Sequence, residues 1–174
     1  MQKLNTEEIT RISLDEFKNT AKIPLVVVLD NVRSLHNVGA VFRTADAYLV
    51  EKICLCGITA VPPNAEIHKS ALGAEFSVDW QYFSDTLDAV KYLKDSGFTL
   101  LAIEQAQNST LLNEFQPEKD KKYAVILGNE VFGVQQSVIN ECAACLELPQ
   151  FGTKHSLNVS VTAGIVIWEF FAHR

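Results

Sequence analysis

The chain has 174 residues and a formal net charge of −6; 48% of its residues are hydrophobic and 21% are charged. This composition is typical of one globular domain with a sizeable core, and no apolar run is long enough to span a membrane. The first residues lack the apolar segment of a signal peptide, so we expect a cytoplasmic protein, and the acidic charge argues mildly against nucleic acid as a partner.

The hydrophobic pattern predicts alternating helices and strands along the chain. Ser13, followed by Asp15 and Glu16, caps a short helical segment predicted within residues 6–20. Apolar, β-branched runs predict buried strands at residues 25–30, 52–57, 77–83, 98–104, 123–128 and 145–149. Helices are predicted at residues 37–49, from a cap at Ser84 to Gly97, around residues 134–142, and from about residue 156 to Arg174. The alternation indicates an α/β domain with a mostly parallel sheet and flanking helices.

The last predicted helix is apolar on two sides. One stripe consists of Leu157, Val161, Ile165 and Trp168, and the other of Val159, Ala163, Val166 and Phe170. One stripe can cover the sheet, whereas the other either contacts a partner or is buried within the same domain.

Four cysteines occur as two close pairs, Cys54 with Cys56 and Cys142 with Cys145. Paired cysteines can bind zinc, but the first pair lies in an apolar strand and the second precedes a strand without the turn of a zinc knuckle. We therefore expect no metal site and four reduced thiols, which serve as small core residues.

Polar clusters follow three of the predicted strands, at the strand ends where open α/β sheets place their ligands. Dinucleotide-binding, P-loop, nucleophile-elbow and metalloprotease signatures are absent from the sequence. The first cluster, DNVRSLHNVGAVFRT, contains Asn37, Gly39 and Arg43, and the exposed guanidinium of Arg43 suits an RNA phosphate. A lone helical arginine can equally be a solvated surface charge.

The second cluster, ILGNEVFGV, contains two glycines that allow close backbone approach, Gly128 and Gly133, together with the carboxylate of Glu130. Glu130 could instead complement a helix dipole. The third cluster, LPQFGTKHSLNVSV, carries Ser156 and Asn158 at the expected start of the last helix, where they could hold a polar ligand. Ser156 could equally act as the helix cap.

These clusters, in this order, resemble the motifs of the SpoU or TrmH branch of the SPOUT RNA methyltransferases. That family's motifs read approximately N-x-G-A-x-x-R-T-A, L-G-N-E-x-x-G and I-P-x-x-G-x-x-x-S-L-N-V-S, and here they stand as NVGAVFRTA, LGNEVFG and LPQFGTKHSLNVS. Leu148 replaces the commoner isoleucine, and SLH stands where many members have a proline before the first motif's asparagine. Neither departure removes a polar group.

The resemblance implies a methyltransferase domain at residues 24–174, preceded by a lead-in at residues 1–23, with a deep C-terminal trefoil knot, a rare exception to ordinary chain connections. It implies a homodimer packed through the knot region and the last helix, with the active site at the interface. It also implies S-adenosylmethionine as the cofactor, in a pocket lined by Ile103, Leu127, Gly128, Gly133, Leu148, Pro149, Ser156 and Leu157.

The activity that the resemblance implies is RNA 2′-O-ribose methylation, with Arg43 as the catalytic arginine and Asn37, Glu130, Ser156 and Asn158 positioning substrate and neighbouring groups. A guanidinium does not readily release a proton, so we expect Arg43 to bind phosphate and stabilise the forming alkoxide, and the identity of the general base stays open.

The substrate that the resemblance implies is tRNA or rRNA, with guanosine the family's commonest target. The alternatives are a catalytically silent RNA-binding dimer and a methyltransferase with a non-RNA substrate; a basic patch around Arg43, with Arg11, Arg33, Lys69 or Lys154, would favour RNA.

Overall fold

The computed structural model of the protein describes residues 1–5 and 8–173. Its elements are α1 (Leu14–Asn19), β1 (Ile23–Asp30), α2 (Leu35–Ala47), β2 (Val50–Cys56), α3 (Ala65–Ala71), α4 (Ala74–Ser77), β3 (Trp80–Phe83), α5 (Thr86–Asp95), β4 (Thr99–Ile103), β5 (Thr110–Leu111), a 3-10 helix (Leu112–Glu114), β6 (Tyr123–Leu127), α6 (Gln136–Ile139), β7 (Ala144–Glu147) and α7 (Val159–Ala172).

The strands form one seven-stranded sheet in the order β3-β2-β1-β6-β4-β7-β5, and every neighbouring pair is parallel. This confirms the mostly parallel α/β sheet predicted from the sequence. Because β1, β6, β4 and β7 are neighbours and run parallel, the polar clusters that follow β1, β6 and β7 lie at the same carboxyl-terminal end of the sheet.

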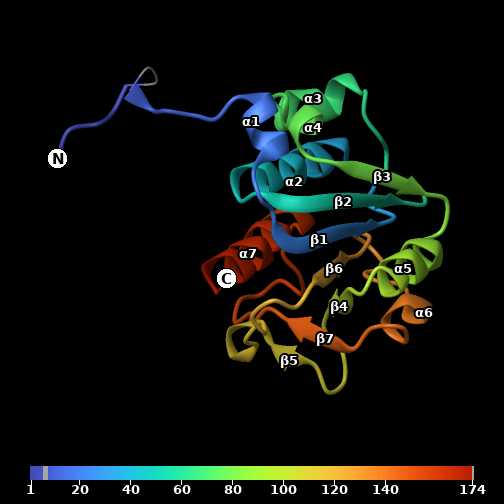
Figure 1. Ribbon diagram of the computed structural model, residues 1–174. Helices are drawn as coiled ribbons and strands as arrows, with labels where there is room; N and C mark the ends of the chain where they lie inside the picture. The colour runs from blue at the N-terminus through green and yellow to red at the C-terminus, as the bar shows by residue number, and fades with distance from the viewer. Residues whose placement is uncertain (6–7, 174) are drawn as a thin grey trace.

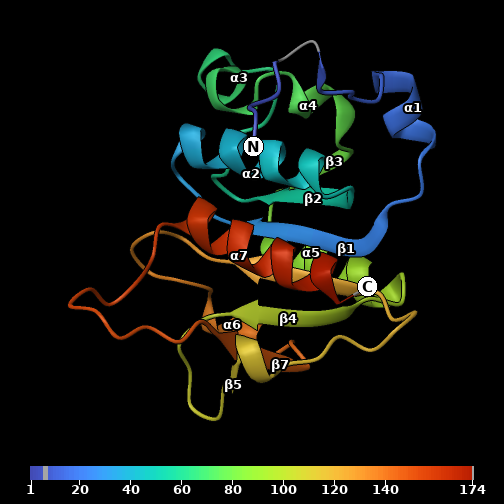
Figure 2. The same cartoon turned by 90° about the vertical axis from the view of Figure 1, so that its left-hand side faces the viewer.

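Helices cover both faces of the sheet, as Figures 1 and 2 show: α2 and α7 lie on one side, and α5 and α6 on the other. Alternate side chains of a strand point to opposite faces. In β1, Leu25, Val27 and Leu29 join the core under α2 and α7, while Val26 and Val28 join the core under α5 and α6. No helix within the described ranges is long and apolar enough to cross a membrane.

The two apolar stripes predicted for the last helix have different environments. Val159, Ala163, Val166 and Phe170 are buried against the sheet. The other stripe, Leu157, Val161, Ile165 and Trp168, is 42–51% exposed. The prediction that one face of the helix covers the sheet is therefore confirmed. That the other face contacts a partner stays a prediction.

The N-terminal helix is shorter than predicted. Ser13 caps it as expected: its hydroxyl accepts a hydrogen bond from the Glu16 N–H at 3.2 Å, and the Glu16 carboxylate accepts one from the Ser13 N–H at 2.7 Å. Residues 8–12 lie outside the helix, in a segment that leads away from the domain (Figure 1), and residues 6–7 lie outside the described residues.

Several predicted element boundaries were wrong because a neighbouring polar side chain provides the cap. Asp85, not Ser84, caps α5, and its carboxylate accepts from the Leu87 N–H at 2.9 Å. Asn158, not Ser156, caps α7. The helix predicted from residue 37 begins at Leu35, after Ser34 as its cap.

Other differences come from short elements that weak periodicity conceals. The strand predicted at residues 77–83 begins only at Trp80, since Ser77 ends α4. The helix predicted around residues 134–142 reduces to α6. The polar stretch after β4 contains the unpredicted edge strand β5, whose two residues pair with β7.

Candidate active site

A pocket of about 960 Å³ lies where the central strands end. Its walls come from the segments that follow β4, β6 and β7 and from the first turn of α7. Figure 2 shows loops projecting beyond the sheet next to the N-terminal end of α7. Small-molecule sites usually enclose about 300–1,000 Å³, so this pocket is large enough for a cofactor.

The pocket gathers most of the residues expected at the cofactor. Ile103, Leu127, Gly128, Gly133, Leu148, Ser156 and Leu157 line it. Pro149 does not, although its neighbours Leu148 and Gln150 do. Pro149 is exposed, because alternate residues of an extended segment face opposite sides, and its contact with the cofactor stays a prediction.

The two glycines of the second cluster let chain segments approach one another. A Cβ added to Gly128 would lie 2.1 Å from the backbone of Gly133 and Val134. Gly133 has a φ of +67°, and a Cβ there would lie 2.0 Å from Oε2 of Glu104. Asn129 and Gly133 also exchange two backbone hydrogen bonds of 2.9 and 3.1 Å. The glycines therefore shape a tightly folded loop that forms one wall of the pocket.

A chain of hydrogen bonds joins all three polar clusters. The Asn37 amide donates to Oε1 of Glu130 at 3.2 Å, and the Asn158 amide donates to Oδ1 of Asn37 at 3.1 Å. These three residues, each expected at the active site, thus contact one another directly. Because these side chains form hydrogen bonds mainly with other groups of the protein, they are suited to holding the three loops in place.

The Glu130 carboxylate lies at the N-terminus of α2, where it accepts hydrogen bonds from the backbone N–H groups of Arg33 at 3.1 Å and Ser34 at 3.2 Å. Partial burial by itself raises its pKa, but the backbone donors and the Asn37 amide outweigh that effect, and the pKa lies below its ordinary value of 4.5. Glu130 therefore does complement a helix dipole, but that of α2 and not of the segment that follows it.

Arg43 lies apart from this pocket. Its side chain is exposed on α2, it does not line the pocket, and it forms no ion pair with any residue of the described ranges. Ser156 lines the pocket, but Asn158, and not Ser156, caps α7. Within one chain, the guanidinium and the pocket are thus not brought together.

Sequence reasoning missed two carboxylates at strand ends. Glu104 follows β4 and lines the pocket, and Asp30 ends β1, fully buried. The signal was available, since each is an acidic residue closing an apolar strand run. Asp30 is part of the first cluster, but no role was predicted for it. The residues predicted at the cofactor include Ile103 but not the following residue, Glu104.

The cysteine pairs pack against the core under α5 and α6. Cys54 and Cys56 are buried, while Cys142 and Cys145 are half-buried, and all four are free thiols. Burial raises the pKa of Cys54 and of Cys142 to about 12. No group of three or more His, Cys, Asp or Glu side chains in the described part of the chain is placed to hold a metal ion.

The fold and the pocket define an α/β protein whose ligand site lies at the carboxyl ends of parallel strands. A profile of the SpoU rRNA Methylase family matches residues 24–168. A 23S rRNA (guanosine-2′-O-)-methyltransferase RlmB from Neisseria meningitidis is 31% identical over 155 residues, which cover 89% of this chain and 61% of that protein. The chain belongs to the SpoU rRNA methylase family.

Solved structures show the same fold. An AdoMet-bound rRNA methyltransferase from Sinorhizobium meliloti superposes with a TM-score of 0.81 at 28% identity, covering 90% of this chain and 60% of that one. A TrmH/SpoU tRNA modifying enzyme from A. aeolicus gives a TM-score of 0.81 at 24% identity, over 92% of this chain and 82% of that one, and is compared for its fold alone. The chain spans about three fifths of the length of the Neisseria and Sinorhizobium relatives.

SpoU methyltransferases use S-adenosylmethionine, so the expected cofactor is confirmed for the family. The pocket fits that molecule chemically. Ile103, Leu127 and Leu148 supply apolar walls for a flat ring, and the Glu104 carboxylate supplies a partner for a cation. Side chains in place of Gly128 and Gly133 would clash with their neighbours and alter the shape of the loop.

Proposed function

We propose that the protein is an S-adenosylmethionine-dependent RNA 2′-O-ribose methyltransferase, acting on a guanosine of rRNA or tRNA. The observation that carries the proposal is the hydrogen-bond chain from Glu130 through Asn37 to Asn158. It ties the three segments that carry the family's motifs into one unit beside the pocket. An intact, mutually satisfied set of motif residues favours a working enzyme over a catalytically silent RNA-binding dimer.

The bound cofactor would supply an electrophilic methyl group on a sulfonium. The protein's own residues would align the ribose 2′-oxygen with that methyl group, because displacement depends chiefly on positioning. Arg43 would grip a neighbouring RNA phosphate and stabilise the alkoxide as it forms. The general base stays open.

The position of Arg43 supports a homodimeric enzyme. Arg43 lies outside the pocket of its own chain, and the exposed apolar stripe of α7 starts at Leu157, which lines the pocket. A second copy packed on this stripe would bring its own Arg43 within reach of the pocket. We further propose that the domain spans residues 24–174, carries the family's trefoil knot and works in the cytoplasm.

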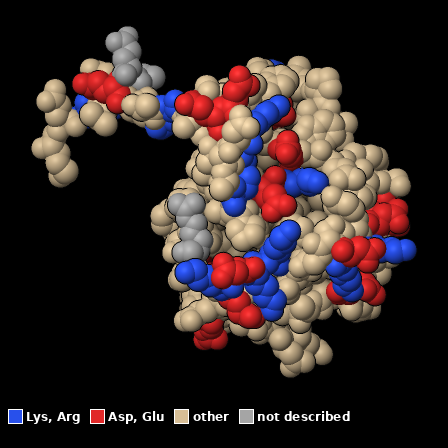
Figure 3. All heavy atoms as spheres, in the orientation of Figure 1, with Lys and Arg blue, Asp and Glu red and all other residues tan. Residues whose placement is uncertain are grey.

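The charge distribution bears on how RNA would be held. On the face drawn in Figure 3, Lys and Arg side chains are interleaved with Asp and Glu and form no single large positive field. With a net charge of −6, RNA affinity would therefore rest on a few local contacts, with Arg43 and Arg33 as exposed cations on α2 and in the loop before it.

The test is transfer of labelled methyl groups from S-adenosylmethionine to total tRNA and to rRNA, followed by nucleoside analysis. We expect a 2′-O-methylnucleoside from the wild type and a loss of at least about 100-fold in Arg43→Ala, a usual cost for removing a group that stabilises developing charge. Lys91→Ala is the control, since Lys91 is an exposed cation on α5, on the opposite face of the sheet. Cofactor binding without labelling of either RNA would instead support a silent binder or a non-RNA substrate.

A further inference from the structure

The formally charged side chains that line the pocket are all acidic. Two carboxylates, Glu104 and Glu130, are among the lining residues, and the lining contains no lysine or arginine. His155 is the one further titratable side chain in the lining. A low-dielectric wall that carries only negative groups favours a cationic ligand over a neutral one of the same shape.

Glu104 is held rigidly in this wall. Its Oε1 accepts a hydrogen bond from the Gln105 N–H at 2.9 Å, and its Oε2 accepts one from the Val134 N–H at 3.0 Å. Gly133 allows this close approach, since a Cβ there would meet Oε2. The charge is thus fixed between the segments that follow β4 and β6, and it loses little freedom when a ligand binds.

Glu130 is less suited to act on a ligand's charge. Its two oxygens accept three hydrogen bonds, from Arg33, Ser34 and Asn37, and it faces the positive end of the α2 dipole. Much of its field is thereby offset within the protein. Glu104 accepts two hydrogen bonds, both from backbone N–H groups, and its charge is offset less than that of Glu130, so it supplies more of the field inside the pocket.

We propose that Glu104 makes the pocket discriminate between S-adenosylmethionine and its demethylated product, S-adenosylhomocysteine. The inference rests on the proposed function. The two molecules share their shape and differ by the sulfonium charge, which is lost when the methyl group leaves its electron pair on sulfur. A fixed carboxylate in the pocket wall attracts the sulfonium but not the neutral thioether, and we expect it to favour the charged reactant by about tenfold. The same field would hasten release of the neutral product.

The experiment is calorimetric titration of the full chain with S-adenosylmethionine and, separately, with S-adenosylhomocysteine. In Glu104→Gln we expect the ratio of the two dissociation constants, product over reactant, to fall about tenfold. Glu104→Asp keeps the charge and should retain most of the ratio even where both ligands bind more weakly. Glu141→Gln is the control, because Glu141 is an exposed acid outside the pocket, paired with Lys94 at 2.5 Å.

The ratio separates an electrostatic role from a merely structural one. A carboxylate that only braces the loops would, when replaced, weaken both ligands equally and leave the ratio unchanged, and that result overturns the inference. Raising the salt concentration should also lower the wild-type ratio, because added ions screen the carboxylate. If the wild type binds neither molecule, the proposed function itself fails.

Discussion

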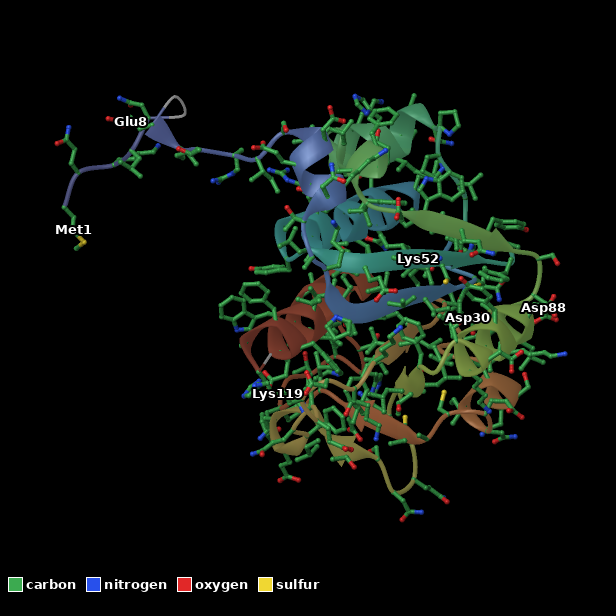
Figure 4. The ribbon with its side chains drawn as sticks, viewed as in Figure 1. Met1, Glu8, Asp30, Lys52, Asp88 and Lys119 are labelled. Carbon is green, nitrogen blue, oxygen red and sulfur yellow. The ribbon has the colours of Figure 1, made fainter. Side chains whose placement is uncertain are left out.

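Asp30 shows how one buried carboxylate organises the strand end. It is fully buried and accepts hydrogen bonds from the amide of Asn31 at 2.8 Å, the hydroxyl of Thr86 at 2.6 Å, and both the backbone N–H and the amide of Gln135 at 3.1 and 2.9 Å. It therefore links β1 to the start of α5 and to the chain that leaves the pocket loop. Figure 4 shows Asp30 at the end of β1 and Asp88 on the outer side of α5.

Replacing Asp30 by alanine should destabilise the fold strongly. The buried Thr86 hydroxyl would be left without its acceptor, at a cost of about 1–3 kcal/mol, and the two donors of the exposed Gln135 would lose their hydrogen bonds to a charged acceptor. We expect Asp30→Ala to lower the free energy of unfolding by about 3 kcal/mol or more, measured by urea denaturation. Asp88→Ala, on the exposed side of α5, should change it by no more than about 0.5 kcal/mol. Equal stability of the two variants would show that the Asp30 hydrogen bonds contribute little.

At the scale of elements, the contact between α2 and α3 sets where the first polar cluster lies. Gly39 in α2 faces α3 so closely that a Cβ would lie 2.1 Å from the Ser70 hydroxyl oxygen and 2.3 Å from the backbone oxygen of Ile67. The absence of a side chain at Gly39 therefore allows close approach to a neighbouring helix. It brings α3 against the helix that carries Asn37 and Arg43.

We expect Gly39→Ala to lower the free energy of unfolding by about 1–3 kcal/mol, because the Ile67 backbone cannot move aside as a flexible side chain could. Gly152→Ala is the control: apart from its chain neighbours, no atom lies within 4 Å of the added Cβ, and the substitution should change stability by no more than about 0.5 kcal/mol. Thermal unfolding of both variants checks this. If Gly39→Ala were as stable as the wild type, the two helices would have room to separate.

The long elements could be predicted from the sequence because their signal is strong and local. The run from Leu25 to Asp30 and the two stripes of α7 follow from burial on both faces of a sheet and on one face of a helix. Caps could not be assigned with the same certainty, because Ser84 and Asp85, or Ser156 and Asn158, offer equivalent acceptors a residue or two apart. Backbone geometry, set by tertiary packing, selects between them.

The residues of the site could be predicted from the sequence, but the contacts between them could not. The polar residues after β1, β6 and β7 could be found from their place at strand ends. Which of them contact each other depends on the strand order, and that order puts β6 between β1 and β4. The bond between Asn37 and Asn158, 121 residues apart, and the roles of Glu104 and Asp30 required the folded chain.

At the scale of the whole molecule, the exposed stripe of α7 and the distant Arg43 lead to one expectation about assembly. We expect the wild type to sediment at twice the 19.3 kDa of one chain. Ile165→Glu, which places a charge in the middle of the stripe, should sediment as a monomer and lose methyl transfer. Leu87→Glu is the control, since Leu87 is a similarly exposed apolar residue on α5 and lies outside the stripe.

Complementation between two inactive variants tests whether the site is shared. Arg43→Ala lacks the guanidinium, and Gly128→Ala distorts the pocket wall, since its Cβ meets the Gly133 backbone. If Arg43 of one copy serves the pocket of the other, a mixed dimer contains one complete site, and an equimolar mixture refolded together should recover about a quarter of the wild-type activity. If each chain uses its own Arg43, no mixed dimer has a complete site and the mixture stays inactive. Circular dichroism of each variant alone ensures that loss of activity is not loss of fold.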